Sequence, residues 1–143
     1  MPNRESVPVV TCFIMRAHRG EDQILLVRRS DRVRTYQGAW AAISGYLEPG
    51  VTPVEQAQTE ILEETGLTPD DVALEASGET LIVDDGAHNL MWAVHPFLFR
   101  LQSTSEPSID WEAHEYAWVS PSGMSGRETV PGLVEALALV YPR

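Results

Sequence analysis

The sequence contains no lysine and has only one cysteine. All ten basic residues are arginines, against 21 acidic residues, which gives a formal net charge of −11 and an isoelectric point near 4.6. A chain with this charge repels polyanions, so sequence-specific binding of DNA or RNA is not expected. Where arginine does act, it favours planar, two-point contacts to carboxylate or phosphate groups.

Long apolar runs and cysteine clusters are also missing. Cys12 has no partner for an internal disulfide, and no cysteine and histidine residues show the spacing of a zinc site, so we expect a cytoplasmic protein. The apolar run 7–15 is too short to cross a bilayer, and no membrane partner is expected. The 143 residues, 43% of them hydrophobic, suit a single domain over 1–143.

Hydrophobic periodicity and turn residues predict several strands and a C-terminal helix. Segments 7–16 and 23–29 are expected to form a hairpin, and 40–44 a short strand that ends at Gly45. Segments 72–83 and 90–101 are expected to form a longer hairpin about Asp84, Asp85 and Gly86. A short strand is expected over 116–119, and 131–140 is apolar enough to be a helix packed on the sheet.

The clearest local signal is a helix that begins after Thr52. Thr52 is suited to the N-cap, Pro53 to the first helical position, and Glu55 to the third position of a capping box. Gly66 supplies the C-terminal stop. The helix carries an apolar stripe at helical spacing, formed by Val54, Ala57 and Ile61.

Three glutamates share another edge of this helix. Glu60, Glu63 and Glu64 are spaced i, i+3 and i+4, which places them within an arc of roughly 100°. Like charges at this spacing cost about 0.2–0.5 kcal/mol per pair, and positions 35–99 contain no lysine or arginine to offset them. Clustered carboxylates without a thiolate suit Mg²⁺ or Mn²⁺, ions that share their coordination with phosphates. Without further context, three glutamates at this spacing more often form a solvated acidic face of a helix.

The surrounding sequence favours the metal site over the solvated face. Residues 45–67, GYLEPGVTPVEQAQTEILEETGL, resemble the Nudix box of the Nudix hydrolases: Gly, five residues, Glu, seven residues, Arg-Glu, an aliphatic residue, any residue, Glu-Glu, any residue, Gly and an aliphatic residue. The matching positions are Gly45, Glu60, Ile61, Glu63, Glu64, Gly66 and Leu67.

Two positions depart from this pattern. Val51 stands where the family has its first glutamate, and Thr59 stands where it has arginine. In the family these two side chains support each other and help to hold the loop against the helix. Here both are replaced together, so neither leaves an unpaired charge. Their loss is expected to affect metal affinity or turnover.

The resemblance implies an α/β/α sandwich around a mixed β-sheet, and hydrolysis of the pyrophosphate bond of a nucleoside di- or triphosphate derivative with Mg²⁺ or Mn²⁺. It implies that Glu60 and Glu64 hold the metal, with Glu63 and the Gly45 carbonyl nearby. The general base stays open. The candidates are Glu60 and Glu63 in the box and, on a later acidic loop, Glu112 and Glu115, which are also candidate additional ligands.

Substrate contacts are expected from side chains outside the helix. Arg28, Arg29 and Arg34 precede the box and suit phosphate oxygens, and Tyr46 suits stacking on a base. The alternative is that these arginines only cover the surface. The expected partner is a small nucleotide or nucleotide conjugate, and the sequence does not say which one.

Three functional hypotheses remain at this level. The first is a metal-dependent Nudix pyrophosphohydrolase. The second, which Val51 and Thr59 motivate, is a Nudix fold that binds nucleotide with weak or no turnover. The third is an acidic structural domain. A homodimer through the last helix is also open.

Overall fold

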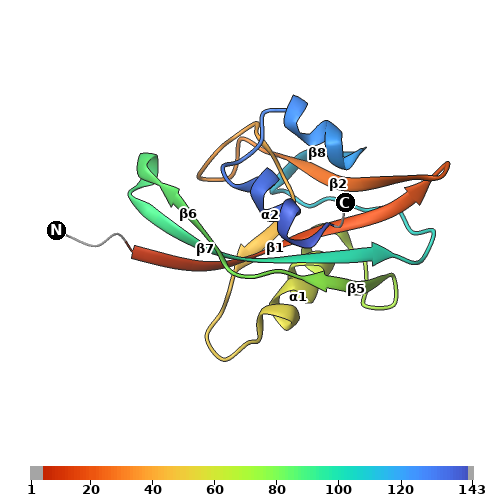
Figure 1. Ribbon diagram of the computed structural model, residues 1–143, viewed down its shortest axis with the longest axis horizontal. Coiled ribbons are helices and arrows are strands. Elements are labelled where there is room, and N and C mark those ends of the chain that lie inside the picture. The colour runs from red at the N-terminus through yellow and green to blue at the C-terminus, as the bar shows by residue number, and fades with distance from the viewer. Residues whose placement is uncertain (1–4, 142–143) are drawn as a thin grey trace.

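The computed structural model describes residues 5–141 as an eight-stranded sheet with one helix on each face (Figure 1). The elements follow in chain order: β1 (Glu5–His18), β2 (Glu21–Arg29), β3 (Trp40–Ala41), β4 (Ile43–Tyr46), α1 (Pro53–Thr65), β5 (Val72–Ser77), β6 (Leu81–Asp85), η1 (Gly86–His88), β7 (Leu90–Leu101), β8 (Ala113–Val119), η2 (Pro121–Gly126) and α2 (Leu133–Val140).

The sheet is mixed because its two long central strands, β1 and β7, run parallel while the other pairs are antiparallel. The main path of the sheet is β3-β2-β1-β7-β5, with β4 on β1, β6 on β7 and β8 on β2. The predicted first hairpin is present, since β1 and β2 pair up to His18 and Glu21. The expected α/β/α sandwich around a mixed sheet is therefore confirmed.

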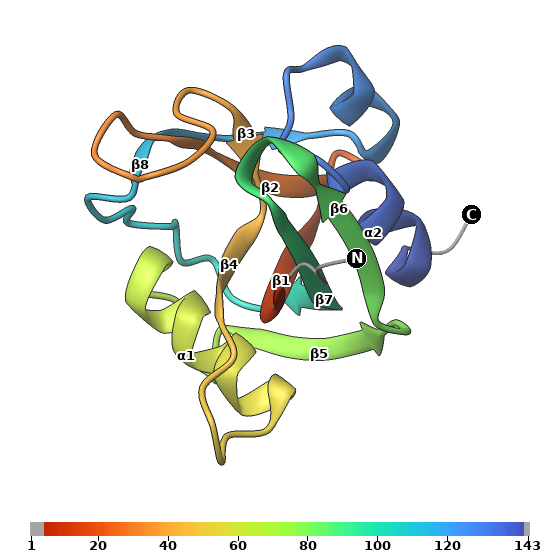
Figure 2. The same cartoon turned by 90° about the vertical axis from the view of Figure 1, so that its left-hand side faces the viewer.

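Two cores lie on the two faces of the sheet. Successive side chains of a strand point to opposite faces, so Cys12 and Ile14 of β1 pack on the side of α1, while Phe13 and Met15 pack on the side of α2. Figure 2 shows the two helices on opposite sides of β1 and β7. The first core fixes α1 against one face of the sheet, and the second fixes α2 against the other.

The helix α1 forms as predicted. The hydroxyl of Thr52 accepts a hydrogen bond from the backbone N–H of Glu55, and the Glu55 carboxylate accepts one from the N–H of Thr52. At the other end, Gly66 takes the left-handed conformation, with φ of 76°, and donates its N–H to the carbonyl of Leu62. Both ends of the helix are thus set by local hydrogen bonds.

The predicted strand 72–83 is wrong, because the chain forms two strands there. Both β5 and β6 pair with β7, and they are separated at Gly78, which donates its N–H to the carbonyl of Pro96. Proline has no N–H to donate in return, so the ladder is interrupted at this point. The following turn is also shifted: Asp84 and Asp85 lie in β6, and the chain reverses through η1 and Asn89, whose φ is 56°.

Three further expectations are corrected in detail. The strand expected over 40–44 is two strands, β3 on β2 and β4 on β1. Strand β8 begins at Ala113, so Glu115 is a strand residue rather than a loop residue. Helix α2 begins at Leu133, after Gly132 in the left-handed region. Within residues 5–141, none of the helices is long and apolar enough to cross a membrane.

Candidate active site

The box glycine and the first box glutamate lie against each other. Gly45 lies in β4, where it pairs with Val10 of β1, and Glu60 lies in the second turn of α1. A β-carbon at position 45 would collide with the carboxyl group of Glu60. Glycine is therefore required at this position by the close approach of the helix.

The three box glutamates have very different surroundings. Glu64 is buried, Glu60 is partly buried, and Glu63 is exposed. The carboxyl groups of Glu60 and Glu64 are hydrogen-bonded to each other, one helical turn apart. Burial raises the pKa of Glu60, and the negative charge of Glu63 adds a smaller contribution in the same direction. The sequence spacing predicted a shared edge of the helix but not this gradient of burial.

Glu64 carries the most perturbed carboxyl group of this site. Burial raises its pKa to about 10, with further contributions from the hydrogen bond to Glu60 and from the negative charges of Glu112, Glu60 and Asp110. Its exposed fraction is 9%, and its Oε2 atom has no hydrogen-bond partner. A buried carboxylate oxygen without a partner is costly, so this atom is suited to a ligand that brings positive charge.

Of the two candidate carboxylates on the later segment, Glu112 belongs to the site. It lines a cavity of about 340 Å³ together with Gly45 and Glu60. Burial and the charges of Asp110 and Glu60 raise the pKa of Glu112. Glu115 instead forms an ion pair with Arg28, with 3.7 Å between Oε2 and Nη1, and it does not line the cavity.

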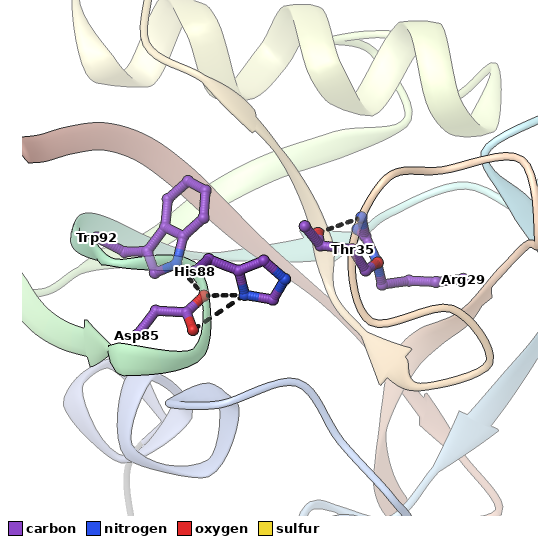
Figure 3. Close-up of polar contacts among 5 residues, drawn as sticks. All are labelled: Arg29, Thr35, Asp85, His88 and Trp92. Carbon is purple, nitrogen blue, oxygen red and sulfur yellow. Dashed lines mark hydrogen bonds and ion pairs between the residues drawn. The ribbon is translucent and has the colours of Figure 1, made fainter.

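The three candidate arginines also differ in their position relative to the cavity. Arg29 lines the cavity, and its Nε donates to the carbonyl of Thr35 at 2.8 Å (Figure 3). Burial lowers the pKa of Arg29, opposed mainly by the charge of Glu112. Arg28 is turned to Glu115 and to the carbonyl of Gly38, and Arg34 is an exposed residue that is not part of the cavity wall. Of these three arginines, Arg29 alone lines the cavity.

The cavity has an acidic end and an aromatic end. The acidic end is formed by Glu48, Glu60 and Glu112, near Arg29. The aromatic end is lined by Tyr36, Tyr46 and Trp92, and the ring centroids of Tyr46 and Trp92 are 6.3 Å apart. Tyr46, which the sequence analysis named, is 65% exposed and stands at the rim.

Behind the aromatic end lies a buried aspartate that sequence reasoning missed. Asp85 is 3% exposed and accepts hydrogen bonds from Nε1 of Trp92 at 3.0 Å and from Nδ1 of His88 at 3.1 Å (Figure 3). Burial raises its pKa, but hydrogen bonds from Trp92, Tyr36 and His88 outweigh burial and bring the pKa to about 2. Asp85 thus holds the aromatic wall as a carboxylate.

The sequence does contain a pattern that predicts this cluster, but the pattern is visible only if the turn between β6 and β7 is placed correctly. With the reversal placed at 86–89, residues 83, 85, 90 and 92 fall on one face of the β6–β7 hairpin, as the observed pairing of Asp85 with Leu90 and Val83 with Trp92 shows. The expected turn at 84–86 concealed this relationship.

The donor set fits a hard divalent cation. Among residues 5–141, no three acidic, histidine or cysteine side chains already converge on one point to hold an ion. Mg²⁺, however, is usually held by one or two carboxylates and completes its shell with water and phosphate oxygens. Glu60 and Glu64 supply two carboxylates, one of them with an unpartnered oxygen. The one nearby sulfur among residues 5–141, that of Cys12, is buried and donates to the carbonyl of Ala57. Burial and the charges of Glu64 and Glu60 raise the pKa of this thiol, which disfavours the thiolate that a softer metal would need.

Comparisons with known proteins agree with this arrangement. The NUDIX domain model matches residues 5–138. An RNA pyrophosphohydrolase from Francisella philomiragia subsp. philomiragia is 32% identical over a match of 122 residues; the coverage is 72% for this chain and 78% for the relative. An Ap4A hydrolase of C. elegans, solved as a binary complex, has a TM-score of 0.79 at 19% identity, covering 92% of this chain and 93% of that chain. A MutT protein from Methanosarcina mazei Go1 has a TM-score of 0.75 at 24% identity, covering 96% and 94%. The chain therefore belongs to the NUDIX family.

Proposed function

We propose that this chain is a divalent-metal-dependent pyrophosphohydrolase that cleaves the pyrophosphate bond of a nucleoside di- or triphosphate derivative. The observation that carries the proposal is the hydrogen-bonded pair of Glu60 and Glu64, with an unpartnered Glu64 oxygen, beside a cavity that also contains Arg29. Glu60 and Glu64 are the proposed metal ligands, with the Gly45 carbonyl and Glu63 as further candidates.

A bound Mg²⁺ or Mn²⁺ supplies charge to neutralise pyrophosphate oxygens and to lower the pKa of a water molecule. The chain's own residues do the positioning. Arg29 is held by Thr35 at the cavity wall and presents a fixed guanidinium to a phosphate oxygen. The net acidic site makes the cation necessary, because Glu48, Glu60 and Glu112 outnumber that one arginine and would repel a pyrophosphate.

Glu112 is the proposed general base. It lines the cavity together with Glu60, and burial and neighbouring negative charges raise its pKa, which moves a carboxylate toward the range in which it accepts a proton efficiently. Glu115 is less suited because Arg28 neutralises it. Glu63 and Glu60 remain alternatives within the helix.

The nucleoside part of the substrate is assigned to the aromatic end of the cavity. Tyr46 and Trp92 present ring faces or edges there, and a volume of about 340 Å³ suits one nucleotide unit rather than a long chain. A second moiety would extend past the exposed rim at Tyr46. A relative is named an RNA pyrophosphohydrolase, and on that ground the proposed substrate class includes RNA that carries a pyrophosphate bond.

A product analysis on a panel of nucleoside triphosphates, dinucleoside polyphosphates, nucleotide sugars and 5′-triphosphate RNA, with Mg²⁺, Mn²⁺ or chelator, tests the proposal. Metal-dependent cleavage supports it. The second candidate, a nucleotide-binding module without turnover, is favoured specifically by Val51 and Thr59. Nucleotide binding with no product on any compound would select that candidate.

A further inference from the structure

The loop after β4 is joined to the α1 helix by a buried amide. Gln56 is 4% exposed, and its side chain spans the two segments. Its Oε1 accepts a hydrogen bond from the backbone N–H of Glu48 at 3.1 Å, and its Nε2 donates to Oε2 of Glu60 at 2.9 Å. Both ends of the amide are therefore used, one on the loop and one on the carboxylate.

The two departures from the box pattern lie beside this bridge. Val51 is at the tip of the same loop, where its N–H donates to the carbonyl of Glu48, and Thr59 is an exposed residue of α1. Neither is placed to orient Glu60 with a charged group, since one is aliphatic and the other points to solvent. The amide of Gln56 is the side chain that contacts both the loop and Glu60.

The position of Glu60 is consequently fixed on two sides. The backbone of Gly45 blocks its carboxyl group on one side, because even a β-carbon would collide with it. The Gln56 amide holds Oε2 on the other. A glutamate side chain has three rotatable bonds, and fixing it before binding removes an entropy cost that a ligand would otherwise have to offset.

We infer that Gln56 is a positioning residue that orients Glu60 toward the cation and holds the 47–51 loop at the acidic end of the cavity. This inference rests on the proposed function, since it concerns the same carboxylate. Gln56 acts through Glu60 and the loop and not by contact with the reacting atoms. The neutral amide of Gln56 links the loop to the helix, and this link does not depend on residues 51 and 59.

The test compares two glutamines of one helix. Gln56→Met removes both hydrogen bonds at similar side-chain volume, and Gln58→Met makes the same chemical change at an exposed position. Mn²⁺ affinity of each full-length protein is measured by calorimetric titration, together with the melting temperature in chelator and the kinetic constants on a cleaved substrate. Gln56→Asn, which keeps an amide but is one methylene shorter, is the second variant in case Gln56→Met does not fold.

We expect Mn²⁺ to bind about tenfold more weakly to Gln56→Met and to Gln56→Asn, because the loss of a residue that orients a metal ligand typically lowers metal affinity by this much. Gln58→Met should bind Mn²⁺ with native affinity. In chelator, the Gln56 variant whose Mn²⁺ affinity is compared should be folded to nearly the same extent as the native chain. Equal Mn²⁺ affinity in all four proteins would overturn the inference while leaving the proposed function standing. Absence of Mn²⁺ binding by the native chain would overturn both. Weakened binding in the Gln56 variants, with no cleavage by the native chain, would support the inference and overturn the proposed turnover.

Discussion

Glu60 and Glu64 share a hydrogen bond between two carboxyl groups at one turn of α1, and the Oε2 atom of Glu64 beside it is buried without a partner. Two carboxyl groups can share a hydrogen bond only if one of them keeps a proton. Without a cation, that proton resides on Glu64, whose pKa is raised to about 10 chiefly by burial. A divalent ion and a proton therefore compete for this pair.

The first prediction concerns stability and pH in the absence of metal. The pKa of Glu64 in the fold lies far above its ordinary value of 4.5, so its contribution to stability is complete below pH 4.5 and is lost as the pH rises toward 10. The melting temperature in chelator should fall from about pH 5 to about pH 9, and Glu64→Gln should flatten this decline. Thermal melts across that range check it, with exposed Glu135→Gln as the control. Parallel curves for all three proteins would refute this assignment.

The second prediction concerns the contact between Gly45 and Glu60. Gly45→Ala places a methyl group where the Glu60 carboxyl group lies, so the helix or the carboxylate must move. We expect a loss of about 1–3 kcal/mol in the free energy of unfolding and weaker Mn²⁺ binding. Gly126→Ala is the matched control, because a β-carbon at position 126 meets nothing within 4 Å. Denaturant unfolding and metal titration measure both effects, and a native-like Gly45→Ala protein would contradict the packing.

Features that depend on residues close together in the sequence could be predicted, whereas features that depend on distant residues could not. The helix α1 was predictable, because its capping residues lie close together in the sequence. The packing of Gly45 against Glu60 was not predictable, because it depends on how the helix docks on β4. The break between β5 and β6 was not predictable, because it depends on Pro96, which meets Gly78 only through strand pairing. Gln56 looked like any polar helix residue, since its burial is set by the loop that packs over it.

The same limit applies to the later segment and to the aromatic wall. Glu112 and Glu115 are close in the sequence, yet a strand begins between them and sends Glu115 to Arg28 while Glu112 lines the cavity. Asp85 was assigned to a turn because the reversal was placed two residues too early. Its partner His88 lies in the observed reversal, and its partner Trp92 lies in the strand that follows.

A third prediction concerns Asp85. Asp85→Asn removes a charge that accepts hydrogen bonds from Trp92 and His88 in a buried position, so we expect a loss of about 1–3 kcal/mol in unfolding free energy. Because Trp92 lines the nucleoside end of the cavity, KM should rise more than kcat falls. Steady-state kinetics and tryptophan fluorescence on nucleotide addition test this, beside the exposed Asp31→Asn. A fall in kcat at unchanged KM would place Asp85 in a different role.

A fourth prediction concerns the guanidinium of Arg29. Arg29→Lys keeps the charge but loses the planar fork that contacts both the carbonyl and the hydroxyl of Thr35. With one charged hydrogen bond lost, we expect kcat/KM to fall on the order of tenfold. Arg34→Lys, at an exposed position outside the cavity wall, should retain native activity. Equal losses in the two variants would contradict a specific role for the Arg29 guanidinium.

The measurement that tests the central claim most directly is product formation from the nucleotide panel by the native chain, by Glu64→Gln and by the control Glu135→Gln, each with Mn²⁺ or Mg²⁺ and with chelator. The account predicts cleavage of a pyrophosphate bond that requires the metal, persists in Glu135→Gln and falls about a hundredfold in Glu64→Gln, because the second carboxylate ligand is lost. Turnover that continues in chelator, or that is unchanged in Glu64→Gln, would contradict the account.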